Sequence, residues 1–146
     1  MTPKALSREI KFRAWDVENN RWIYKDGYTL DELCANGYEI AEKLNVLVWL
    51  QFTGLHDKNG KEIYEGDIMK VLDRDWSDAE KDTKILIVYY RNDRYILINK
   101  AGIEESEKSE PNIYSKEWYE VSLFREYGRD KFEIIGNIYE NPELLN

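Results

Sequence analysis

Short apolar runs alternate with turn residues along the chain, and this pattern constrains the fold more than any other feature. Residues 10–16 alternate apolar and polar side chains with a period of two, as in a half-buried strand. Strand-sized apolar runs recur at residues 46–55, 68–72 and 85–90. Because Asn, Asp and Gly separate these runs, the sequence predicts a mainly β domain, α+β by content. We expect a small barrel or roll with one helical addition.

Two turns are marked most clearly. The step Asn59-Gly60 follows Asp57, and both residues of the step tolerate a positive φ, so we expect a tight hairpin there. A second bend is expected at Gly66-Asp67, where glycine supplies conformational freedom and the carboxylate accepts hydrogen bonds from backbone N–H groups. We therefore predict structural roles for Asn59, Gly60, Gly66 and Asp67.

Residues 29–45 carry the strongest helical pattern. Thr29 and Glu32 have the spacing of a capping box, in which a hydroxyl and a carboxylate each accept a bond from an otherwise unused backbone N–H. Apolar residues then recur on one face at helical spacing. The step Asn36-Gly37 weakens the middle, so one helix and two shorter helices both fit. Cys34 is expected to face the core, as free cysteines usually do.

The second half of the chain gives four further expectations. A hairpin is predicted at residues 91–94, between two apolar runs. Residues 102–111 contain four Glu and almost no apolar side chain, which indicates a surface loop. Residues 118–124 fit a strand by their alternation, but they also fit a helix. The segment Phe132–Tyr139 is predicted to be the last strand.

Size and composition favour one domain in a reducing compartment. The 146 residues fit a single domain over residues 1–146, long enough to bury a core without a disulfide or metal. The single cysteine cannot form an internal disulfide. The first ten residues lack the apolar core of a signal peptide, and no run approaches the ~18 apolar residues of a membrane span. We expect a cytoplasmic protein that uses no cofactor and no membrane.

Catalytic patterns are weak. His56 is the only histidine and stands at a polar turn, where a lone imidazole without a positioned partner is a poor general base. Asp57, Asn59 and Glu62 hint at a calcium loop, but Ile68 occupies the position of the Glu that such a loop needs. The sequence contains no phosphate loop, dinucleotide fingerprint or zinc-protease motif. We therefore expect no enzymatic activity.

Three stretches of sequence resemble one family. They are residues 10–16 (IKFRAWD), residues 51–68 (QFTGLHDKNGKEIYEGDI) and residues 135–144 (IGNIYENPEL). Together they are similar to the YopX-like proteins of bacteriophages and prophages of Gram-positive bacteria, as a single YopX-like domain over nearly the whole chain. The resemblance implies an SH3-like β-barrel with a helical addition, and self-association. It implies no catalytic residues, because the family has no established activity.

Charge placement separates two candidate functions. The formal net charge of −8 disfavours sequence-independent binding of nucleic acid. We expect a phage or prophage accessory protein that binds protein, either its own copies in a homo-oligomer or a phage or host partner, because Tyr and Trp suit interfaces. The alternative is single-stranded nucleic-acid binding on a basic barrel edge, where rings stack on bases. The candidate interaction surface consists of Lys11, Arg13, Trp15, Arg21, Trp22, Arg91 and Arg94.

Overall fold

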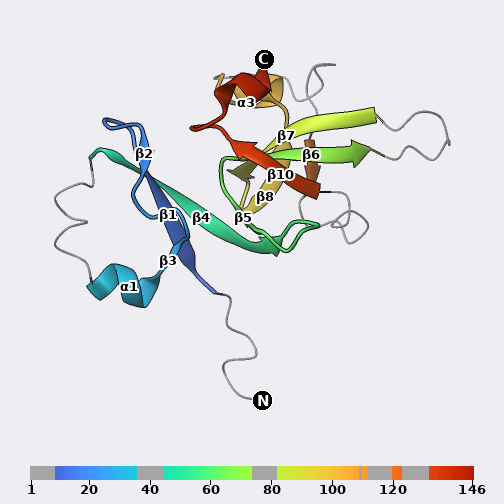
Figure 1. Cartoon of the computed structure of the whole chain (residues 1–146). Coiled ribbons are helices and arrows are strands. Elements are labelled where there is room, and N and C mark those ends of the chain that lie inside the picture. The colour runs from blue at the N-terminus through green and yellow to red at the C-terminus, as the bar shows by residue number, and fades with distance from the viewer. Residues whose placement is uncertain (1–8, 36–44, 74–81, 109, 112–119, 123–131) are drawn as a thin grey trace. The chain divides into compact units, whose positions relative to one another are not determined.

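The fold is mostly β and divides into two compact units (Figure 1). The computed structural model describes residues 9–35, 45–73, 82–108, 110–111, 120–122 and 132–146. The first unit comprises residues 1–55 and the second unit comprises residues 56–146. A curled half-barrel sheet and two helices agree with the predicted barrel or roll with a helical addition, so the fold class is confirmed. The single domain over residues 1–146 stays a prediction.

The first unit is a small antiparallel sheet centred on strand β1 (Lys11–Asp16). One edge of β1 pairs with β4 (Leu47–His56). The other edge pairs with two short strands, β2 (Arg21–Trp22) and β3 (Tyr28–Thr29). The strands predicted from the alternation in residues 10–16 and 46–55 are therefore confirmed as β1 and β4. Strand β2 is only two residues long, although the Ile23 N–H after it still donates to the Ala14 carbonyl of β1 over 2.9 Å.

Helix α1 (Leu30–Ala35) follows β3 directly and begins as predicted. The Thr29 N–H donates to the Glu32 carboxylate over 2.8 Å, and the Glu32 N–H donates to Thr29 Oγ1 over 3.4 Å, which completes the capping box. No residue of α1 is buried. Cys34 is exposed, so the prediction that it faces the core is wrong. In this short helix only Leu33 is half-buried, and the other residues are exposed. The step Asn36-Gly37 lies outside the described residues.

The second unit contains a five-stranded antiparallel sheet in the order β10-β6-β7-β8-β9. Its strands are β6 (Asp67–Asp73), β7 (Asp82–Arg91), β8 (Arg94–Ile98), β9 (Glu120–Ser122) and β10 (Phe132–Asn137), and β5 (Glu62–Tyr64) precedes β6. The core side chains below 2% exposure are Ile63, Ile68, Met69, Leu86, Val88, Ile96, Leu97 and Ile98. These side chains come mainly from the three central strands, as the apolar runs predicted.

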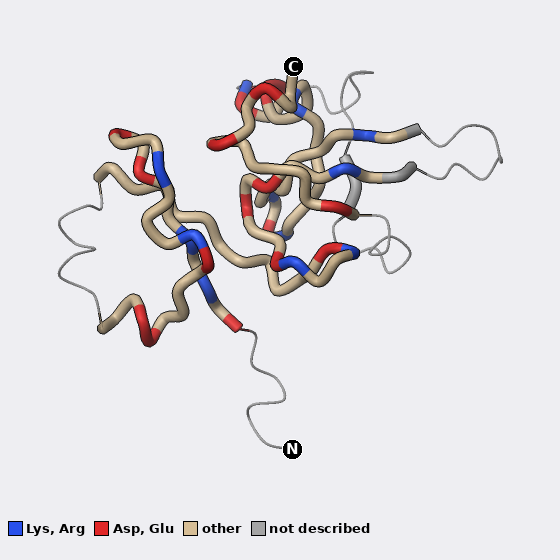
Figure 2. Tube along the Cα trace, viewed as in Figure 1, with Lys and Arg blue, Asp and Glu red and all other residues tan. Residues whose placement is uncertain are grey.

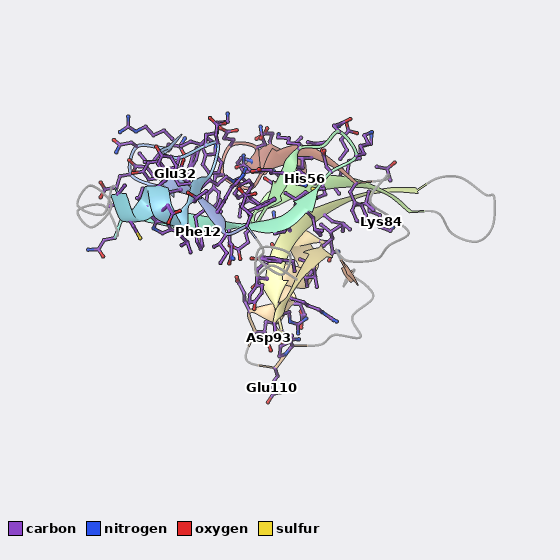
Figure 3. All side chains as sticks on the ribbon, turned by 90° about the horizontal axis from the view of Figure 1, so that it is seen from below. Phe12, Glu32, His56, Lys84, Asp93 and Glu110 are labelled. Carbon is purple, nitrogen blue, oxygen red and sulfur yellow. The ribbon has the colours of Figure 1, made fainter. Side chains whose placement is uncertain are left out.

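The hairpin between β7 and β8 is confirmed, and it contains no glycine. Arg91 and Arg94 are directly opposite each other, and the two residues between them have positive φ angles, 50° for Asn92 and 63° for Asp93. Two successive positive angles match the type I′ turn that suits the twist of paired strands. Figure 3 labels Asp93 at the tip of this hairpin.

The sequence did not predict the secondary structure of two segments of the second unit. Residues 102–111 were predicted to be a surface loop, but helix α3 spans Lys100–Ser106, so that prediction is wrong. Asn99 caps the helix by accepting a hydrogen bond from the Gly102 N–H over 3.0 Å. In the ambiguous segment 118–124, residues 120–122 form strand β9 on β8. A 3₁₀ helix, Pro142–Leu145, follows β10. Among the described helices, none has the length and apolar character that crossing a membrane requires.

Candidate protein-interaction surface

Each of the three sequence motifs places some of its polar side chains inside the fold. Six polar or charged residues are buried in the described part of the chain: Arg13, Asp16, Thr53, Asp57, Asp67 and Asn137. All six fall within residues 10–16, 51–68 and 135–144. Buried polar groups need partners, because burial without a hydrogen bond is unfavourable. The motifs are therefore best understood from what these side chains bind.

Asp16 ends strand β1 and organises the turn that leads to β2. One carboxylate oxygen accepts bonds from the backbone N–H groups of Glu18 and Asn19, both over 3.1 Å, and the other accepts the Asn19 side-chain amide over 2.8 Å. The Arg21 Nε lies 3.9 Å from the same carboxylate. The Asn19 side-chain donor, with the backbone donors and Arg21, lowers the pKa of Asp16 despite its burial. The carboxylate is a turn cap held in its charged form.

Asp57 ties its own turn to a distant strand. One carboxylate oxygen accepts the N–H groups of Asn59 and Lys61, both over 2.9 Å, and the other accepts the N–H of Ile134 in β10 over 3.1 Å. The Lys58 backbone N–H donates a hydrogen bond to the Phe132 carbonyl over 2.9 Å. The Lys58 side chain also makes a 2.8 Å ion pair with Glu133. We call the hydrogen bonds of residues 57–61, within this turn and to β10, the Asp57 latch; the exposed Lys58 ion pair lies beside the latch and is not part of it.

The turn inside the Asp57 latch is wider than the tight hairpin that the sequence predicts. Gly60 has a φ of 79°, whereas Asn59 does not have a positive φ. The Gly60 N–H donates to the Asp57 carbonyl over 3.0 Å, and the Asp57 N–H donates to the Lys61 carbonyl over 2.8 Å. This is a three-residue loop in which glycine alone occupies the left-handed position. The latch explains the difference, since the Asn59 and Lys61 amides both turn toward one carboxylate.

Asp67 and Asn137 shape the remaining bends. The buried Asp67 carboxylate accepts the Tyr64 N–H over 2.8 Å, across the Gly66 bend, where φ is 78°. The Asn137 side-chain oxygen accepts two successive backbone N–H groups, those of Tyr139 over 3.0 Å and Glu140 over 2.9 Å. The buried carboxylates of Asp16, Asp57 and Asp67 and the buried amide of Asn137 thus accept backbone hydrogen bonds at turns. In the described residues, no group of three His, Cys, Asp or Glu side chains could hold a metal ion.

Aromatic rings gather on one face of the first-unit sheet. The strand register places Tyr28 opposite Phe12 and Trp49 opposite Ala14, so these rings share one face. The Tyr24 ring links them, with its centroid 4.0 Å from that of Tyr28 and 6.1 Å from that of Trp49, to which it is stacked. Tyr24, Tyr28 and Trp49 are half-buried. We call these three residues the aromatic cluster.

The opposite face of the same sheet holds most of the candidate residues predicted from the sequence. Trp15 and Trp22 meet edge to face with ring centroids 5.0 Å apart, and the Arg13 guanidinium lies 4.6 Å from the Trp22 ring centroid. Arg13 and Trp15 are buried and Trp22 is half-buried, so Arg13 and Trp15 offer little surface to a partner. Arg21 is exposed, but the register pairs it with Asp16, which places it on the same face as the aromatic cluster.

Lys11, Arg91 and Arg94 complete the predicted set. The Lys11 ammonium lies 5.5 Å from the Phe52 ring centroid and 3.3 Å from a Glu9 oxygen. Arg91 and Arg94 belong to the second unit, on the β7–β8 hairpin. Figure 2 shows basic and acidic positions interspersed in both units rather than gathered by sign. The described residues therefore give no sign that the basic residues form one continuous edge.

Comparison with known proteins gives the family. The model of the YopX protein family matches residues 11–146. The chain belongs to the YopX protein family. Among solved structures it is similar to the protein EF1440 from Enterococcus faecalis, at 24% sequence identity and a TM-score of 0.50, over 96% of this chain and 100% of that one. This likeness concerns the fold alone. No curated protein sequence matches the chain.

The family resemblance in the sequence was thus correct, but the motifs that carry it did not locate the aromatic cluster. Tyr24, Tyr28 and Trp49 all lie between the motifs rather than inside them. Their spacing in sequence gives no sign of contact, because it is the pairing of β1 with both β3 and β4 that brings them together. The only signal available was the aromatic content of two short apolar runs.

Proposed function

We propose that this member of the YopX family is a non-enzymatic module that binds protein, its own copies included, through the aromatic cluster. As the sequence resemblance implies, it would serve as an accessory protein of a phage or prophage in the bacterial cytoplasm. The observation that carries the proposal is the set of three half-buried rings held in mutual contact on one sheet face. Rings fixed in this way lose little conformational entropy when a partner covers them.

The chemistry of the cluster suits a protein partner. Tyr and Trp offer a large apolar surface and a hydrogen-bond donor at the edge of the ring, which is why interfaces are enriched in them. Each ring in the cluster is already fixed on one side by its neighbour, so a partner would add burial without reorganising the sheet. Exposed Lys25, next to Tyr24, would form part of a polar rim.

Single-stranded nucleic acid is the alternative partner, and two observations weigh against it. Stacking platforms for bases usually lie in a positive groove. Here Lys11 is close to Glu9 and Arg21 is close to Asp16, so acidic neighbours offset the charge of both cations. The net charge of −8 adds a long-range repulsion toward phosphates.

The test compares one variant in the cluster with a matched variant elsewhere. Tyr24→Lys places a charge among the three rings, whereas Tyr90→Lys makes the same change at an exposed tyrosine of the second unit. Circular dichroism first establishes that both variants fold. Light scattering and sedimentation then measure the mass of each at several concentrations. We expect the parent and Tyr90→Lys to form oligomers and Tyr24→Lys to be largely monomeric.

Two other outcomes redirect or overturn the proposal. A monomeric parent that shifts a single-stranded oligonucleotide at ~150 mM salt would replace the proposal with nucleic-acid binding. If the parent is monomeric and binds no oligonucleotide, the tagged variants are recovered from phage-bearing cells. A protein retained by the parent and Tyr90→Lys but lost with Tyr24→Lys would support the proposal. Equal recovery with all three would overturn it.

A further inference from the structure

The exposed step Asn59-Gly60 has the features of a site of chemical modification. Both residues are exposed, and a Cβ built on Gly60 would meet nothing within 4 Å, so no neighbouring residue crowds the side-chain position of Gly60. Within the described part of the chain, the only hydrogen bond of Asn59 outside regular strands and helices is the one from its backbone N–H to Asp57. The Asn59 carboxamide is therefore able to rotate toward the following peptide nitrogen.

We propose that Asn59 undergoes spontaneous deamidation, and that the Asp57 latch sets its rate. In the first step the Gly60 backbone nitrogen attacks the carboxamide carbon of Asn59. A new C–N bond closes a five-membered succinimide, the Gly60 nitrogen gives up its proton, and the side-chain nitrogen takes up a proton and leaves as ammonia. Water then opens the ring at either carbonyl, giving aspartate or isoaspartate. Water is the only co-reactant, and no oxidant, metal or enzyme is needed.

The folded turn opposes the first step. The attacking nitrogen already donates its hydrogen to the Asp57 carbonyl over 3.0 Å. The Asn59 N–H is held by the Asp57 carboxylate over 2.9 Å, which restrains the rotation that would bring the carboxamide carbon near Gly60. Both restraints come from one residue, and both must be released before the ring can close. The reaction therefore proceeds through a local opening of the latch rather than from the closed turn.

The two products should affect the latch differently. Aspartate at position 59 keeps the main chain unchanged, so the bonds from Asp57 to Lys61 and Ile134 are retained. Isoaspartate inserts one extra atom into the main chain between Asp57 and Lys61. The Asp57 N–H donates a hydrogen bond to the Lys61 carbonyl over 2.8 Å, and the Lys61 N–H donates one to the Asp57 carboxylate over 2.9 Å. A longer main chain between the two residues would disrupt both hydrogen bonds. The isoaspartate form would carry a weakened connection to β10.

The experiment follows the mass and identity of residue 59 over time. The full chain is incubated at 37 °C in mildly alkaline buffer, together with a synthetic peptide of residues 55–64. Peptide mapping by mass spectrometry separates the aspartate and isoaspartate products. We expect the folded chain to react at Asn59 ~10-fold more slowly than the peptide, equivalent to ~1.4 kcal/mol for opening the latch. The Asn59→Gln variant should remain unmodified at this position.

Two variants separate the role of the latch from general unfolding. Asp57→Asn loosens the latch and should move the rate toward that of the peptide, whereas Lys58→Gln removes only the exposed ion pair to Glu133 and should leave the rate unchanged. If Asp57→Asn does not fold, the parent in mild denaturant replaces it, and the rate should rise before global unfolding. A folded chain that stays unmodified while the peptide reacts to completion would overturn the proposal. Equal rates in peptide and folded chain would refute the role of the latch.

Discussion

Replacement of Asp57 by alanine should destabilise the second unit. The carboxylate is 7% exposed and accepts three backbone N–H groups, from Asn59, Lys61 and Ile134. A hydrogen bond to a charged group contributes ~1.5–3 kcal/mol, but donors that can turn to water recover much of that. Asn59 and Lys61 are exposed and can do so, whereas Ile134 is half-buried within β10.

The expected loss for Asp57→Ala is therefore about 3 kcal/mol, less than the sum of three independent bonds. Lys58→Ala provides the matched control in the same turn. Its side chain and that of Glu133 are both more than a third exposed, so solvent screens their ion pair, and its removal should cost at most ~0.5 kcal/mol. The backbone bond from Lys58 to Phe132 does not depend on the side chain and persists in this control.

Urea denaturation followed by far-ultraviolet circular dichroism measures both losses. Hydrogen exchange at the Ile134 amide provides a local readout, because this amide should lose protection in Asp57→Ala even under conditions where the chain stays folded. If Asp57→Ala unfolds at the same urea concentration as Lys58→Ala, and the Ile134 amide stays protected, then the carboxylate does not hold the turn against β10.

Two further predictions concern a packed glycine and a titrating cap. Gly136→Ala should lower the free energy of unfolding by ~1–3 kcal/mol, because the new Cβ would lie 2.5 Å from Asn141 Oδ1. In denaturant unfolding, adding Asn141→Ala should recover part of this loss. If the losses of the two single variants simply add in the double variant, the clash is contradicted. Donors from Asn19 lower the folded-state pKa of Asp16 below its ordinary value of 3.8, so its contribution to stability is full above that value and lost as pH falls through the lower folded-state pKa. The difference in unfolding free energy between the parent and Asp16→Asn should accordingly stay constant from about pH 7 to about pH 5 and shrink as pH falls toward about pH 3, and a difference that does not change with pH would argue against the cap.

Sequence patterns predicted the strands well because alternation is a local property. The runs at residues 10–16, 46–55, 68–72 and 85–90 each became part of a strand. The capping box at Thr29 was also predictable, since it needs only two residues at fixed spacing. In each of these cases the residues that decide the structure are near neighbours in the chain.

Features that depend on pairing between distant segments were not predictable in the same way. Helix α3 lacks an apolar stripe of ordinary length, and it depends instead on the Asn99 cap and on close packing of Gly102 against Ile98. The three-residue loop at Gly60 depends on a carboxylate that also binds β10, 77 positions away in sequence. The aromatic cluster exists only because β3 and β4 lie on the two edges of β1.

The confinement of buried polar side chains to three short segments has a consequence for how the family diverges. Substitutions within those segments would remove turn caps, and therefore act on folding before they could act on binding. Tyr24, Tyr28 and Trp49 stand outside the segments and are only half-buried, so a change at one of them removes none of the six buried polar groups. Two relatives with the same three segments would then share a scaffold yet select different partners. Under the proposed function, a choice of partner would therefore be traced through the rings on the first-unit sheet rather than through these three segments.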